Sequence, residues 1–255
     1  MNTNQLLEMC SYAGKLLIQN GAEIYRVEET MVRLCTSFPE VEDAESFVTP
    51  TGIMLSITVN KTTHTKILRV RNNGVDLNCI DKINELSRQA ATSSFTIEEL
   101  QTRLHAIADE KRYSFLPTLF FGALSAFGFA LFFGGNIIVA VCSFVIGMAI
   151  KSMSWFMEHH AFNNFFTNAV SAGIGAFFAL IFHALFKEAP VDIMIISSIM
   201  LLVPGLAITN AIRDTVAGDY LSGVSRGVEA VIAAVAIAAG IGFVLSMSIG
   251  ISGGM

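Results

Sequence analysis

The chain has 255 residues, a formal net charge of −5 and an apolar composition, 53 % hydrophobic and only 15 % charged. With no basic cluster in the sequence, nothing favours nucleic acid as a partner. The cysteines form no CxxC pair and no histidine lies at zinc-ligand spacing from them, so we expect reduced, buried thiols and neither a metal nor a cofactor. These are Cys10, Cys35, Cys79 and Cys142.

The charges are unevenly distributed along the chain. Residues 1–112 hold 12 Lys or Arg and 15 Asp or Glu, whereas residues 113–255 hold 4 and 6. The sequence therefore predicts a soluble domain over 1–112 and a membrane domain over 113–255. The first residues are polar and resemble no signal peptide, so we expect the soluble domain in the cytoplasm.

The soluble domain is predicted to be a small α+β domain. Helical periodicity marks two amino-terminal helices and two later ones, of which the last begins with the capping box Thr96-x-x-Glu99. Between the two pairs, β-branched runs separated by turn residues predict an antiparallel meander. The predicted helices are 4–20, 22–35, 75–90 and 96–110, and the predicted strands are 46–49, 53–59 and 65–71.

The second half of the chain predicts about five transmembrane helices. Residues 113–150 contain no charged side chain, and about 20 apolar residues suffice to cross the hydrocarbon core. The spans are rich in glycine and alanine, which let helices pack closely in lipid. The predicted spans are 114–133, 137–153, 165–186, 193–209 and 225–250.

The distribution of positive charges predicts the orientation. In the five-span arrangement Lys187 lies on the far side, and the other positive residues near span ends lie on the side of the soluble domain. These are Lys111, Arg112, Lys151, Arg213 and Arg226. We therefore expect a multi-pass protein of the cell inner membrane, with a cytoplasmic amino terminus.

Pro204-Gly205 interrupts the fourth predicted span. Proline removes a backbone hydrogen bond and clashes with the preceding turn. Broken helices occur in membranes where the freed groups face protein or a wet cavity, and transporters use them to build substrate sites. A simple packing kink is the alternative reading.

Charged and polar residues gather directly after this break. If the helix continues, Asn210, Arg213 and Asp214 share a face, and Ser222, Arg226 and Glu229 share a face of the last span. A cytoplasmic loop with surface salt bridges would explain the charges alone. The functional reading is a substrate site. Arg213 and Arg226 would hold a carboxylate, Asp214, Asp219 or Glu229 would hold an amine or a proton, and Asn210 and Ser222 would supply neutral hydrogen bonds.

Other chemistry finds less support in the sequence. Glu158, His159 and His160 are adjacent rather than spaced as metal ligands, and a hydrated loop explains them better. An intramembrane enzyme would need a nucleophile with a base, and Ser171 and Ser197 have neither a histidine nor a carboxylate at a suitable spacing.

Several motifs together resemble the threonine/serine exporter family over nearly the whole chain. They are Leu202-Val203-Pro204-Gly205, Asn210-Ala211-x-Arg213-Asp214, Gly218-Asp219, Ser222-Gly223, Arg226 and Glu229-Ala230 in the second half, and Gly21-Ala22-Glu23-x-x-Arg26-Val27-Glu28 and Pro50-Thr51-Gly52-Ile53 in the first. Glu23, Arg26 and Glu28 are explained by a salt-bridged surface face, whereas their place in the motif suggests that they dock the soluble domain against the membrane half.

The resemblance implies export of small amino acids, or of a dicarboxylate such as succinate in a two-chain branch. Some members carry ten spans in one chain, about twice the number expected here. The resemblance therefore implies a second, smaller membrane subunit of the same family as partner, or a homo-oligomer. A regulatory or assembly subunit remains the alternative function.

Overall fold

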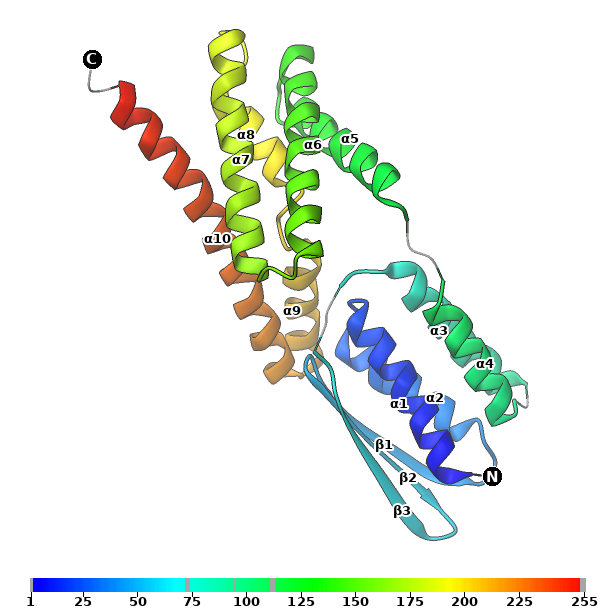
Figure 1. Cartoon of the computed structure of the whole chain (residues 1–255). Helices are drawn as coiled ribbons and strands as arrows, with labels where there is room; N and C mark the ends of the chain where they lie inside the picture. The colour runs from blue at the N-terminus through cyan, green and yellow to red at the C-terminus, as the bar shows by residue number, and fades with distance from the viewer. Residues whose placement is uncertain (1, 72–73, 94, 111–112, 253–255) are drawn as a thin grey trace. The chain divides into compact units, whose positions relative to one another are not determined.

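The computed structural model describes residues 2–71, 74–93, 95–110 and 113–252, and it divides into two compact units (Figure 1). One unit comprises Met1–Lys111 and Gly205–Val228, and the other comprises Arg112–Pro204 and Glu229–Met255. Residues 205–228, which the sequence grouped with the membrane half, thus pack with the amino-terminal part. Lys111 and Arg112, used to predict the boundary and the orientation, lie outside the described residues.

The first unit opens with two helices joined by a tight turn. Helix α1 spans Thr3–Gln19 and α2 spans Ile24–Thr36, close to the predicted ranges. Gly21 has a φ of +91°, a left-handed conformation that glycine adopts without a Cβ penalty and that commonly ends a helix. The turn therefore lies outside both helices, and its backbone carbonyl groups need hydrogen-bond partners from elsewhere in the chain.

Three strands follow as the predicted antiparallel meander. They are β1 (Val41–Thr49), β2 (Gly52–Val59) and β3 (Thr62–Arg69), in the spatial order β1-β2-β3. Alternate residues of β2 are buried, including Ile53, Leu55 and Ile57, as expected for a sheet with one covered face. Strand β1 starts before the predicted residue 46. The prediction began too late because the first half of the strand carries charged residues on an exposed edge, and these obscure the strand pattern in the sequence.

Helices α1 and α2 pack on that covered face, with α3 (Leu77–Thr92) and α4 (Ile97–Ala108) on their other side. Thr96 caps α4 by accepting a hydrogen bond from the Glu99 amide at 3.2 Å, as the capping box predicts. The apolar residues between these layers form one continuous core.

The second unit contains α5 (Phe115–Phe132), α6 (Ile137–His159) and α7 (Asn164–Leu185), each long and apolar enough to span a membrane. Small residues mediate the contact between α5 and α6, as predicted from the composition. A Cβ added to Gly147 would lie 2.9 Å from the Cβ of Ala126. The two helices are therefore as close as glycine allows.

Helix α10 spans Tyr220–Ser252 and carries the fourth candidate span. Its membrane part crosses α7 closely, because a Cβ on Gly240 would lie 1.9 Å from the carbonyl oxygen of Ala169. An apolar groove lies along this crossing, with Gly173, Phe177 and Phe243 among its lining residues.

The predicted fourth span, 193–209, is not one helix. Helix α8 (Val191–Ile199) ends before Pro204, and α9 (Gly205–Ala217) begins directly after it. The helix break predicted at Pro204-Gly205 is thus present. Its consequence is that the described residues contain four helices of spanning length and not five. Ser143 and Ser197, hydrogen-bonded at 2.9 Å, join α8 to α6.

Candidate functional site

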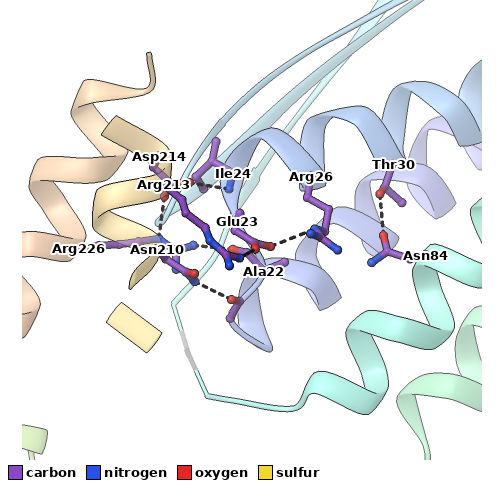
Figure 2. A network of polar contacts seen from close by, with 11 residues as sticks. Ala22, Glu23, Ile24, Arg26, Thr30, Asn84, Asn210, Arg213, Asp214 and Arg226 are labelled. Carbon is purple, nitrogen blue, oxygen red and sulfur yellow. Dashed lines mark hydrogen bonds and ion pairs between the residues drawn. The ribbon is translucent and has the colours of Figure 1, made fainter. Parts of the chain in front are cut away.

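The polar residues after the break meet the turn between α1 and α2. Asn210, Arg213 and Asp214 project from α9, and Arg226 projects from the first turns of α10 (Figure 2). All four contact residues 21–24, and all lie in the first unit. We call this arrangement the turn clamp.

Two of these side chains bind carbonyl groups of the turn. The Asn210 amide donates to the Gly21 carbonyl oxygen at 2.8 Å, and Nη2 of Arg226 donates to the Ala22 carbonyl oxygen at 2.7 Å. Both carbonyls lie outside the helices because Gly21 reverses the chain after α1. The clamp thus supplies partners that the turn lacks within its own secondary structure.

Asp214 caps α2 from a distant part of the sequence. Its Oδ1 accepts a hydrogen bond from the Ile24 amide at 3.1 Å. Ile24 is the first residue of α2, and the residue before it, Glu23, makes no side-chain cap. A carboxylate at this position satisfies a free amide and interacts favourably with the positive end of the helix dipole.

Asp214 also forms an ion pair with Arg226. Oδ2 of Asp214 and Nε of Arg226 are 3.2 Å apart, in an orientation outside hydrogen-bond geometry. Asp214 is fully buried and Arg226 is 8 % exposed. Burial raises the pKa of Asp214, although the Ile24 amide and Arg226 act in the opposite direction. The charged form of this aspartate loses its hydration on burial, and the Ile24 amide and Arg226 offset part of that cost.

The Glu23 carboxylate forms ion pairs with two arginines. It pairs with Nη1 of Arg213 and, at 3.0 Å, with Nε of Arg26. Burial alone would raise the pKa of Glu23, but its own backbone amide, Arg26 and Arg213 together lower it. Arg213 stays 55 % exposed. It is the clamp residue with a charge that faces solvent.

The remaining predicted site residues are less closely gathered. Ser222 is buried, and Asp219 is partly buried beside Glu28. Glu28 accepts a hydrogen bond from the Val48 amide at 2.9 Å, and burial raises its pKa, with the charge of Asp219 adding to the effect. Glu229 and Pro204 belong to the other unit, where Glu229 is exposed.

A close helix crossing supports the clamp. A Cβ on Gly223 would lie 2.1 Å from Oγ1 of Thr215 and 3.0 Å from the Ala211 carbonyl oxygen. Gly223 therefore lets α10 approach α9, which places Arg226 beside Asp214. Within the described residues, no group of three or more His, Cys, Asp or Glu side chains could hold a metal ion.

Comparison with known proteins gives the family of this chain. The family model described as "Putative threonine/serine exporter" matches residues 8–248. The chain belongs to this family. A curated relative, the "Probable succinate transporter subunit YjjP" of Klebsiella aerogenes, is 25 % identical over 242 residues, which cover 94 % of this chain and 92 % of the relative. No solved structure matches the chain.

Membership of the threonine/serine exporter family indicates a membrane transport protein and not an enzyme. The structure brings together residues 21–24 and 210–226, two segments about 190 residues apart on which the resemblance in the sequence rested. Glu23 forms ion pairs with Arg26 and with Arg213, and all three residues lie in the first unit. Glu28 instead binds the backbone of β1.

Sequence reasoning missed the partners that the clamp binds. Most are backbone atoms of Gly21, Ala22 and Ile24, and backbone atoms leave no trace in a pattern of side chains. The available signal was the presence of this turn in the amino-terminal family motif. Gly21, with its positive φ, marks the position where the carbonyls become accessible.

Proposed function

We propose that this chain is one subunit of an exporter for small carboxylate-bearing metabolites, either threonine- and serine-like amino acids or a dicarboxylate such as succinate. The observation that carries the proposal is the exporter-family match over 8–248, which includes the broken fourth segment and its polar cluster. The name of one relative, a probable succinate transporter subunit, supports a dicarboxylate as substrate. An ion gradient across the cell inner membrane would drive export.

Arg213 is the proposed contact for the substrate carboxylate. Asn210, Asp214 and Arg226 already bind the α1–α2 turn, and Asp214 and Arg226 are buried. Arg213 is exposed and pairs with a side chain that a substrate carboxylate can replace. In this proposal Asn210, Asp214 and Arg226 position α9 and the start of α10 on the turn. The buried Ser222 supplies a neutral hydrogen bond, the partly buried Asp219 lines the polar surface, and Glu229 carries a proton.

A second, smaller membrane subunit of the family is the proposed partner, with self-association as the alternative. The relative is described as a subunit, and the described residues here contain four helices of spanning length. The proposed orientation keeps the amino terminus in the cytoplasm.

Efflux measurements test this function. Cells with this chain and the second subunit would be loaded with labelled succinate, threonine or serine. We expect wild type to release at least one label faster than cells without the chain, and Arg213→Ala to reduce that rate roughly tenfold through loss of a charge-assisted contact. Arg213→Lys should retain part of the activity.

Arg88→Ala is the matched control, because Arg88 also forms an exposed salt bridge on a helix of the same unit. Melting temperatures should be similar for the two alanine variants, because Arg213 is half exposed and the buried Glu23 keeps Arg26 as its partner when Arg213 is removed. Unchanged efflux in Arg213→Ala would remove this residue from the substrate site. No export by wild type with its partner would reject the function.

A regulatory or assembly subunit is the second candidate. It is favoured by the clamp itself, in which most predicted substrate residues bind the chain's own backbone. Reconstitution of each subunit alone and of both together distinguishes the candidates. Full transport by the partner alone would make this chain accessory.

A further inference from the structure

Lys151 is a positive charge within a candidate membrane span. Helix α6 continues beyond the predicted end of its span to His159. At 1.5 Å per residue, Lys151 is therefore about 12 Å from the end of the helix. The sequence alone had placed it at the membrane surface, where a lysine requires no explanation.

The described residues provide no counter-charge for this lysine. It forms none of the ion pairs found among them, and it is partly buried. In the described spans α5, α6 and α7 it is the one lysine or arginine. Ionisable groups within membrane spans are costly, and they commonly mark ion or substrate paths.

A glycine accommodates the lysine stem. A Cβ added to Gly122 of α5 would lie 3.0 Å from Cγ and 3.2 Å from Cε of Lys151. The aliphatic chain thus lies along the surface of α5 at a position that an alanine would crowd. This packing holds the stem between the two helices.

Buried polar groups also lie at the contact of α6 with α7. Ser154, one helical turn from Lys151, is hydrogen-bonded to Ser171 at 3.0 Å, and both are buried. Thr167, one turn from Ser171, is 4 % exposed, and its Oγ1 has no hydrogen-bond partner among the described residues. A buried hydroxyl without a partner is unfavourable unless water or a ligand satisfies it.

We propose that Lys151 binds the carboxylate of the transported molecule inside the membrane unit, with the hydroxyls of Ser154, Ser171 and Thr167 along the same path. The inference rests on the proposed export of carboxylates. For an anion that passes between the described helices α5–α7, Lys151 is the one lysine or arginine of these helices that can form an ion pair with it. This site is separate from Arg213, which belongs to the other unit.

The test measures uptake of labelled succinate and labelled threonine into proteoliposomes that contain this chain and the second subunit. Lys151→Met is expected to lower the transport rate at low substrate concentration by roughly tenfold to a hundredfold, the effect of losing a charged contact. Lys151→Arg should retain most of the activity. Thr167→Val, which keeps the shape of the side chain, should give a smaller loss through a raised KM.

A charge-rescue experiment separates binding from a structural role. Lys151→Cys should be inactive until an aminoethyl methanethiosulfonate restores a positive side chain, and the negatively charged sulfonatoethyl reagent should not restore transport. The native cysteines are buried, and the reagents are first shown to leave wild type unchanged. Rescue by both reagents, or by neither, overturns the proposal.

Two glycines of α5 provide a matched pair for the position of the stem. Gly122→Ala should reduce transport severalfold, whereas Gly128→Ala should not, because a Cβ at Gly128 meets no atom within 4 Å. Equal transport by Lys151→Met and wild type overturns the inference while export itself stands. Absence of transport in wild type rejects the exporter function instead.

Discussion

At the scale of single residues, the buried pair of Asp214 and Arg226 is the most consequential feature of the turn clamp. Each side chain has a second task, because Asp214 caps α2 and Arg226 binds the Ala22 carbonyl. Loss of either partner leaves the other charge buried without compensation. Such losses are far more costly than those of surface pairs.

A double-mutant cycle tests this dependence. Asp214→Asn keeps an oxygen for the Ile24 amide but leaves Arg226 without its counter-charge. Arg226→Met leaves Asp214 without its counter-charge. We expect each single change to destabilise the protein by about 3–5 kcal/mol, measured as thermal or denaturant unfolding in detergent. The double variant should cost less than the sum of the two. Strict additivity would mean that the two residues do not interact.

At the scale of elements, the crossing of α9 and α10 determines whether the clamp can form. Its geometry depends on Gly223, whose missing side chain leaves room for Thr215 and the Ala211 carbonyl. The residues of the clamp lie on both helices, so a small separation of the axes would move Arg226 away from Asp214.

Gly223 and Gly227, one turn apart on α10, allow a controlled test of this crossing. An alanine at Gly227 meets no atom within 4 Å, so we expect a melting temperature equal to wild type or slightly higher, because alanine favours a helix over glycine. Gly223→Ala should lower the melting temperature and make the Ile24 amide exchange hydrogen faster. Identical behaviour of the two variants would contradict the close crossing.

Sequence periodicity predicted these elements well and their partners less well. The meander and the helix break at Pro204-Gly205 followed from strong local signals. The face of Asn210 and Asp214 followed from helical spacing, and both residues are buried. Arg213, predicted on the same face, is exposed. This face of α9 packs against a turn near the amino terminus. That contact depends on tertiary packing and on backbone atoms, which a sequence pattern does not report.

At the scale of the whole molecule, the number of membrane crossings depends on the segment from α8 to α9. Helix α8 has nine residues and covers about 13 Å of a hydrocarbon core of about 30 Å. The uncharged residues 200–209 follow it. A crossing made by α8, the break and the first turns of α9 is therefore possible where neighbouring protein satisfies the freed backbone groups.

We predict that this interrupted segment crosses the membrane, which makes five crossings and places the two termini on opposite sides. Residues 193–209 carry no charge, while Asp192 and Arg213 flank them, as expected for a segment with both ends near water. Reporters fused to each terminus, one active only in the cytoplasm and one only outside it, give the sidedness directly. Termini on the same side would mean that α8 enters and leaves by one surface, and the chain would then have four crossings.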